Sequence, residues 1–557
     1  MRLSEVPEGF RRCPVTGLLC HIPTQNIIVA NFVMALISLA IGGLAAVFVG
    51  LSRSSIILLD DPKAYYMWLT AHGMNMLIFW ILWFEVALLY FTATILLNTP
   101  LYSLRLGWLA FAVMLLGQAM IEVLIFTGRA SVLFTAYPPL KAHPLFYVGY
   151  LLFAVGVLIA VAVFFLTLYK AKSEGRFKGS IPLATFGAAV AAIIALTVLF
   201  HGAAILLYML AYVLGYLKTV NVMLVRWYFW GFGHSAQYVN VVAMVTVWYA
   251  LLALATGGVA ERFVNEKYAR FAFVLYTIFV VPGIGHHILV DPGFSVPLKQ
   301  ASGSVGSHFL SVPSMLHALA LLGGVEAFLR ATGHTGLLGW ILKIPWRNPG
   351  FAGLITSMLL FGIGGIIAQP QTTLQPNLMF HNTLWVPAHF HLTVVGGTTL
   401  AFMTISYYIV PLLTLRRLWS PRLALAQIYI SFIGLLIMGF AMMWLGWLGA
   451  PRRTLVLENL VRPEWWLPMS ILTIGVLLWL LGGALYLAIM VATVLLSPRT
   501  EDPSELTGGL VVKAEVLPDA KPSKKGSLVI VFILLFVILL ALYFFSFIRL
   551  TGMPEIW

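Results

Sequence analysis

The sequence predicts an all-α polytopic membrane protein with thirteen transmembrane helices. Of its 557 residues, 61% are hydrophobic and only 9% are charged, whereas an ordinary soluble protein is roughly half apolar and about a quarter charged. Its apolar runs are longer than the roughly 18 residues that mark a candidate membrane span. A transmembrane β-barrel would need short alternating segments instead. The composition therefore excludes a soluble enzyme.

Thirteen apolar segments are separated by polar residues or by Pro and Gly. Several exceed the roughly 20 residues that a bilayer requires, so we expect tilt or extension beyond the lipid. The predicted spans lie near residues 27–51, 68–97, 103–128, 145–169, 181–215, 224–255, 271–290, 305–329, 350–369, 385–415, 423–449, 466–496 and 527–548.

The basic residues predict the orientation. The net charge of +14 comes from 33 Lys and Arg against 19 Asp and Glu, and the basic residues favour the side of the N-terminus by about two to one, as cytoplasmic loops do. We expect a cytoplasmic tail at 1–26, a twelve-helix catalytic core at 27–496, a cytoplasmic linker at 497–526, and a last helix with an outer tail at 527–557. Nucleic-acid binding is the weaker explanation of the charge and is not expected.

Six histidines stand out within or at the ends of predicted spans, where histidine is uncommon and marks a functional-site hypothesis. They come from four segments, yet the predicted orientation places all of them in the outer half of the membrane. Imidazole is a common ligand of iron and copper, and Cys13 and Cys20 are too few for a thiolate-held cluster. Metal binding is therefore favoured over packing or capping. The six are His72, His234, His286, His287, His389 and His391.

Their spacing adds geometry. Residues two apart on a helix point about 200° apart, so His389 and His391 cannot bind one ion but could serve two sites. Tyr238 follows His234 by four residues and shares its helical face, which would set a phenol beside a metal-bound imidazole.

The adjacent pair His286 and His287 has a different requirement. Neighbouring residues on a helix point about 100° apart, so one ion held by both needs a local bend. Pro282, Gly283 and Gly285 could provide that bend.

These residues resemble those of subunit I of the haem–copper oxygen reductases. The shared motifs are a His early in the second span, H-x-x-x-Y in the sixth, HH at the end of the seventh, and H-N-T-x-W-V-x-x-H-F-H leading into the tenth. The match covers essentially the whole chain. It implies two haems and a copper ion, CuB, in the membrane of a respiring prokaryote.

The resemblance implies a role for each motif residue. His72 and His391 would be the axial ligands of a low-spin haem of b type, and His389 the proximal ligand of a high-spin haem of a type. Tyr238 would be linked covalently to His234 and supply an electron and a proton when the O–O bond breaks. The implied CuB ligands are His234, His286 and His287.

Further residues are implied near the haem propionates and along a proton path. Arginine suits a propionate because its guanidinium fork matches a carboxylate. The propionate residues would be Arg452, Arg453, His381 and Asn377. The proton path would contain Tyr249, Thr246, Ser314 and His317.

Within the superfamily the chain most resembles the B type, exemplified by ba-type oxidases of thermophiles. HSAQY replaces the H-P-E-V-Y of the A type, and the D-channel entrance pattern is missing, so one K-like proton route remains. Val245 stands where B-type relatives have a second Tyr, and His317 where they have a Thr. Asn377 and Asn382 replace Asp residues of relatives, and no magnesium site is expected.

The implied function is a respiratory terminal oxidase of the prokaryotic inner (plasma) membrane, which oxidises cytochrome c, reduces O2 to water and translocates protons. The chain lacks the cysteines of a dinuclear copper centre, so a subunit II that carries one is implied, with membrane lipid and a small single-helix subunit as further partners.

Alternatives to this function are a quinol donor in place of cytochrome c and a nitric oxide reductase of the same fold. A proton-relaying transporter and a membrane di-iron oxygenase are rivals from other classes; the histidine boxes of the latter are missing.

Overall fold

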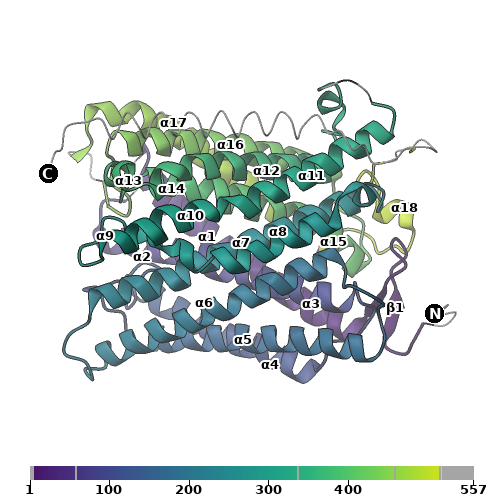
Figure 1. Ribbon diagram of the computed structural model, residues 1–557, viewed down its shortest axis with the longest axis horizontal. Helices are drawn as coiled ribbons and strands as arrows, with labels where there is room; N and C mark the ends of the chain where they lie inside the picture. The colour runs from purple at the N-terminus through teal and green to yellow at the C-terminus, as the bar shows by residue number, and fades with distance from the viewer. Residues whose placement is uncertain are drawn as a thin grey trace.

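The computed structural model describes residues 6–56, 59–334, 336, 338–456, 460–512 and 516. Eleven helices in these ranges are long and apolar enough to cross a membrane, or twelve if one bent pair counts as a single span. They lie side by side along the long axis of the molecule (Figure 1). The fold is therefore one helical bundle.

The long elements alternate with short turns of helix. Those that make up the candidate membrane spans of the structure are α1 (Ile22–Ser52), α2 (Pro62–Met74), η1 (Asn75–Phe79), α3 (Trp80–Thr94), α4 (Leu104–Phe126), α5 (Pro144–Ser173), α6 (Leu183–Val213), α7 (Val222–Ala255), α8 (Glu266–Phe279), η3 (Pro282–Ile288), α9 (Val296–Leu298), η4 (Lys299–Gly306), α10 (Ser307–Phe309), α11 (Ser311–Ala331), α12 (Pro349–Ala368), η6 (Gln369–Thr372), α14 (Trp385–Phe390), η7 (His391–Thr399), α15 (Leu400–Thr414), α16 (Pro421–Trp447), η9 (Pro463–Trp465) and α17 (Trp466–Leu495). The remaining elements are β1 (Phe10–Arg12), β2 (Leu19–His21), η2 (Ala260–Phe263), η5 (Ile341–Lys343), α13 (Leu374–Phe380) and α18 (Pro503–Leu506).

Each of the first twelve predicted spans coincides with one of these elements or with a continuous series of them. The thirteenth, at 527–548, lies outside the described residues, so the count of thirteen and the orientation stay predictions. The seventh span is the bent pair: α8 and η3 meet at 54°. The bend falls at Pro282, where a missing N–H interrupts the helix.

The predicted N-terminal tail contains an antiparallel hairpin of β1 and β2. Arg11 fastens it to the bundle by donating to Gln25 Oε1 at 2.9 Å and to the Leu412 carbonyl at 2.7 Å. Near the other end of the described chain, Val512 N donates to the Ala255 carbonyl at 2.8 Å. Figure 1 shows β1 and α18 at the same end of the bundle.

Helices α4 and α5 approach closely through glycine. A Cβ added at Gly117 would lie 2.5 Å from the Gly149 carbonyl oxygen and 2.6 Å from Phe153 N. Both contacts are to backbone, which cannot rotate away. Small residues at such crossings allow the close packing that drives helix association in membranes.

We therefore predict that Gly117→Ala destabilises the protein by about 1–3 kcal/mol through overpacking. The matched control is Gly43→Ala, since a Cβ at Gly43 meets nothing within 4 Å. Thermal unfolding in detergent, followed for both variants, measures the difference. Equal midpoints for the two would contradict the packing role of Gly117.

Candidate functional site

All six histidines singled out by the sequence line one cavity of about 1750 Å³. This exceeds the roughly 300–1,000 Å³ of a pocket for one small molecule. The lining is mostly apolar and comes from α1, α2, α7, η3, α12, α14 and α16, among other elements. The space and the histidines together suit large, flat, metal-containing groups.

Four of these imidazoles are oriented in the same way. Each has Nδ1 within hydrogen-bonding distance of a backbone carbonyl, and because a carbonyl only accepts, Nδ1 carries the proton. Nε2 then keeps its lone pair, as a metal ligand requires. The pairs are His72 with Gly42 at 3.1 Å, His286 with Gly283 at 3.0 Å, His389 with Gly364 at 2.8 Å and His391 with Pro387 at 2.8 Å.

Three histidines form a cluster suited to one metal ion. One ring nitrogen of each of His234, His286 and His287 lies within 4.8 Å of the others. His234 Nδ1 is 3.3 Å from His287 Nε2. The bend into η3 lets the adjacent pair reach the same point. Nitrogen ligands without thiolates suit copper, iron or zinc.

Two neighbours hold the rings of this cluster in place. The Trp230 indole is stacked on His287 with centroids 3.6 Å apart and planes at 1°. The Ser307 hydroxyl lies 2.8 Å from His286 Nδ1 and also donates to the Gly283 carbonyl. Outer contacts of this kind set the direction of a ligand's lone pair.

Tyr238 lies against this cluster. Its ring centroid is 5.0 Å from that of His234, with planes at 44°. His234 Nε2 is buried and has no hydrogen-bond partner in the described part of the chain. That nitrogen is therefore free for another bond.

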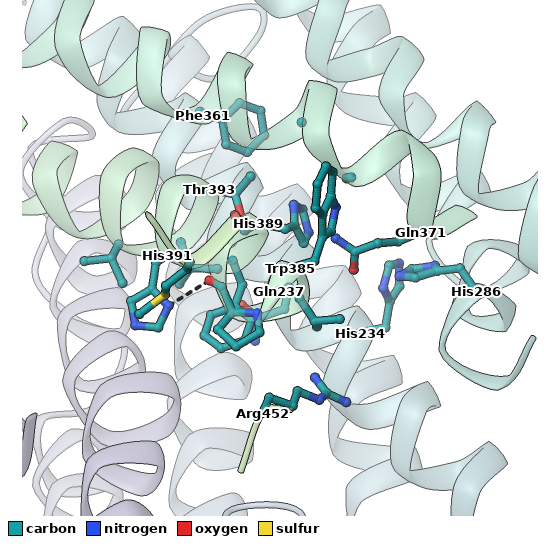
Figure 2. A pocket seen from close by; sticks show the side chains of 18 of the residues that line it. His234, Gln237, His286, Phe361, Gln371, Trp385, His389, His391, Thr393 and Arg452 are labelled. Atoms are coloured by element: carbon teal, nitrogen blue, oxygen red, sulfur yellow. Dashed lines mark hydrogen bonds between the residues drawn. The ribbon is translucent and has the colours of Figure 1, made fainter. Parts of the chain in front are cut away.

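His389 and His391 point in different directions from their shared segment. Figure 2 shows His389 on the side of the cavity where His234 and His286 lie, whereas His391 projects to the other side. A spacing of two residues requires this divergence. One segment thus projects histidine side chains toward two separate places.

Arg452 and Arg453 line the same cavity. Neither makes an ion pair with a carboxylate among the described residues, and Arg452 Nε is buried without a partner. Burial, and then the neighbouring Arg453 charge, lower the pKa of Arg452 to about 9. Two uncompensated guanidinium groups suit an anionic ligand such as a carboxylate.

Arg53 is a lining residue that the sequence did not reveal. It donates to the carbonyls of Thr454 and Pro451 and so fixes the loop that carries the arginine pair. In the sequence it is a single charge at the end of a span, which reads as an ordinary loop residue.

Asn377 and His381 are not among the residues that line the cavity. The His381 amide donates to the Asn377 carbonyl at 2.8 Å. Burial, and then the Arg452 charge, lower the pKa of His381 to about 4. It is therefore neutral near pH 7.

The predicted proton-path residues fall into two groups. Tyr249 OH lies 2.9 Å from His317 Nδ1. Ser314 Oγ lies 2.8 Å from the hydroxyl of Tyr276, a residue the sequence did not single out. Thr246 faces elsewhere: it donates to the Val242 carbonyl and lines a separate cavity of about 40 Å³.

Arg226 is a second residue that the sequence missed. It pairs with Asp291 at 2.6 Å and donates to the His287 carbonyl at 2.9 Å. An arginine inside an apolar span, as this one is, could have been recognised as a functional-site signal.

The fold and the site define the catalytic subunit of a haem–copper oxidase. Residues 26–478 match the family described as Cytochrome C and Quinol oxidase polypeptide I. The chain therefore belongs to this family.

Individual relatives agree with this family membership. The chain is 30% identical over 453 residues to cytochrome c oxidase subunit 1 of Thermus thermophilus, covering 78% of each chain. It is 24% identical over 446 residues to ubiquinol oxidase subunit 1 of Acetobacter aceti, covering 76% of this chain and 62% of the relative. A heme-copper terminal oxidase dimer solved by cryo-electron microscopy matches with a TM-score of 0.77 at 28% identity, covering 91% and 89%.

The contact between Ser307 and His286 yields a prediction. Ser307→Ala should lower the affinity of the three-histidine cluster for its metal about 10- to 100-fold, because His286 loses a partner that orients it. The control is Ser311→Ala, whose hydroxyl donates to the His308 carbonyl. Metal analysis after dialysis against graded chelator measures the change. Equal retention in both variants would contradict the orienting role.

Proposed function

We propose that this chain is the catalytic subunit of a B-type terminal oxidase, which oxidises cytochrome c and reduces O2 to water with four electrons. The observation that carries the proposal is the three-histidine cluster of His234, His286 and His287 with the Tyr238 ring beside it. A metal site next to an oxidisable phenol is the arrangement that oxygen reduction needs. The cavity supports it by offering room for more than one large group.

The chemistry of the donors fits the proposed cofactors. His72 and His391 would hold a low-spin haem of b type, His389 would hold a high-spin haem of a type, and the three-histidine cluster would hold CuB. When bound, these groups supply electron transfer and the reduction of O2. The free Nε2 lone pairs of the carbonyl-anchored imidazoles support this assignment.

The chain's own residues would position these groups and exclude water. Arg452 and Arg453 would bind haem propionates, because their charges lack carboxylate partners among the described residues. His381 and Asn377 would act at the same propionates. The apolar lining strengthens each of these charge interactions.

Tyr238 would donate an electron and a proton, and the free Nε2 of His234 supports a covalent link between the two side chains. Protons would enter by one K-like path through Tyr249, His317 and Ser314. O2 reduction would be coupled to proton translocation through this path. The sequence also placed Thr246 on this path, but its hydroxyl is bonded to the Val242 carbonyl and it lines a separate cavity, so the proposed path runs through the other three residues.

The proposed partners are a subunit II with a dinuclear copper centre, cytochrome c, membrane lipid and a small single-helix subunit, in a prokaryotic plasma membrane. Cys13 and Cys20, the only cysteines, lie near β1 and β2 and cannot supply that copper centre here. Similarity to a ubiquinol oxidase subunit keeps quinol as the alternative donor. A nitric oxide reductase is less favoured, because HSAQY and GHHI lack glutamate.

The deciding experiment is metal and haem analysis of the purified complex, with O2 consumption driven by reduced cytochrome c or by a quinol. We expect two haems and one copper in this subunit, and activity with cytochrome c. A preparation without haem would overturn the proposal. Activity with quinol alone would show that quinol, and not cytochrome c, is the electron donor.

For the low-spin haem, His72→Ala should abolish the low-spin absorption signal and leave CO binding at the other haem detectable. The loss is expected because one of the two histidines that would hold this haem is gone. The control is His201→Ala: His201 also lies beside a carbonyl, that of Thr197 at 2.9 Å, but does not line the cavity. A normal low-spin spectrum in His72→Ala would contradict the assignment of His72 to the low-spin haem.

For the phenol, Tyr238→Phe should keep both haems and CO binding yet lose nearly all O2 reduction. The ring shape is kept and only the oxidisable hydroxyl is removed. Tyr407→Phe, which removes a buried hydroxyl bound to Gln427, serves as control. Peptide mapping of the parent should find the His234 to Tyr238 cross-link. Near-normal turnover in Tyr238→Phe would refute the role.

A further inference from the structure

The proposed path has a gap on α7. Tyr249 and Tyr238 are eleven residues apart, which corresponds to about 16 Å along the helix axis. Val245 stands between them, fully buried and without a polar atom. A proton moves between groups within hydrogen-bonding distance, or through water between them. Helix α7 alone therefore cannot carry a proton between its two tyrosines.

Tyr276, on the neighbouring helix α8, lies beside this gap. Its side chain is fully buried. Its ring centroid is 5.8 Å from that of Tyr238, and its hydroxyl is 2.8 Å from Ser314 Oγ. Ser314 and Tyr238 both line the main cavity. The Tyr276 hydroxyl thus has a polar partner that reaches the space where Tyr238 lies.

His317 joins Tyr276 to the other side of the gap. Its Nδ1 meets Tyr249 OH at 2.9 Å, and its ring lies nearly parallel to that of Tyr276, with centroids 5.7 Å apart and planes at 10°. Its Nε2 is buried and has no hydrogen-bond partner among the described residues. Ser314 precedes His317 by three residues, so both lie on one face of α11.

An imidazole can take a proton at one nitrogen and release another from the second. Because Nδ1 of His317 meets Tyr249 and Nε2 has no partner among the described residues, Nε2 is the nitrogen from which a proton can leave this ring. Thr246 does not bridge the gap from α7, because its hydroxyl is bonded to Val242 in its own helix and lies against a different cavity.

We infer that the Tyr276 hydroxyl is a member of the proton path: it bridges between His317 and Tyr238 together with Ser314, in place of a hydroxyl on α7. This deepens the proposed function and rests on it. In each hop one O–H or N–H bond forms as its neighbour breaks, so the hydroxyls and the imidazole regain their protons after one passage. No oxidant or reductant takes part, and one water molecule at His317 Nε2 or in the cavity can complete a hop.

The test uses the assembled complex with Tyr276→Phe, which keeps the buried ring and removes only the hydroxyl. Proton uptake during O2 reduction is followed with a pH-sensitive dye. Electron transfer between the haems after CO photolysis is followed in parallel, since it needs no proton. A positioned proton-transfer group contributes about 10²–10⁴-fold to a rate, and water can replace part of this. We therefore expect proton uptake to slow by about tenfold or more, with inter-haem electron transfer unchanged.

The matched control is Tyr486→Phe. Tyr486 is equally buried, and its hydroxyl donates to another serine, Ser406, at 3.0 Å, away from the main cavity. It should leave proton uptake unchanged. Ser314→Ala should slow uptake as Tyr276→Phe does, and Ser314→Thr, which keeps a hydroxyl, should restore it.

Normal proton uptake in Tyr276→Phe would overturn the inference, and so would equal slowing in Tyr276→Phe and Tyr486→Phe, which would indicate a packing effect. Neither outcome would affect the proposed function, because the unmodified complex would still reduce O2. An unmodified complex that reduces no O2 would instead overturn the proposed function, and with it the path.

Discussion

The site depends on one interaction, the hydrogen bond from an imidazole Nδ1 to a backbone carbonyl. It recurs at His72, His286, His389 and His391. Each time it leaves the Nε2 lone pair on the side of the ring that faces away from the bonded carbonyl. For His72 and His389 the carbonyl belongs to a glycine of another helix. A Cβ at Gly42 would lie 2.6 Å from Met76 Sδ, and one at Gly364 would lie 2.7 Å from Thr393 Cγ2. The absence of side chains there lets the helices approach closely enough for the bond to form.

Breaks in regular α-helix accompany these histidines. The π-helical segment η1 begins three residues after His72, η3 contains His286 and His287, and the π-helical η7 begins at His391. Irregular backbone is tolerated at membrane depth where it is buried in protein or lines a cavity, and π-helical turns often occur at functional sites. Each break changes the direction in which the neighbouring side chains project. The bundle therefore remains regular where it only packs and departs from regularity around the cavity.

Charge is distributed unevenly around this cavity. The arginine pair at 452 and 453 carries positive charge without a carboxylate partner among the described residues, while Arg226 is neutralised by Asp291 and fixes the His287 carbonyl. Arg53 holds the loop of the arginine pair through two backbone carbonyls. A positive charge beside an apolar lining is energetically costly unless an anion neutralises it. The same arrangement therefore orients a ligand with an acidic edge and a large apolar body.

The sequence by itself determined the twelve spans that lie within the described residues and singled out the six histidines that line one cavity, because hydrophobic length and residue type depend on the chain alone. It also determined that His389 and His391 face different sites and that Tyr238 shares a face with His234, since helical periodicity fixes directions within one helix. Only the tertiary structure decided what lies across from each face. Tyr276 meets Ser314, thirty-eight residues later, and Arg53 meets Thr454 because the rotation and offset of neighbouring helices bring them together. Those quantities depend on the packing of all side chains in the interface, and periodicity within a helix carries no information about them.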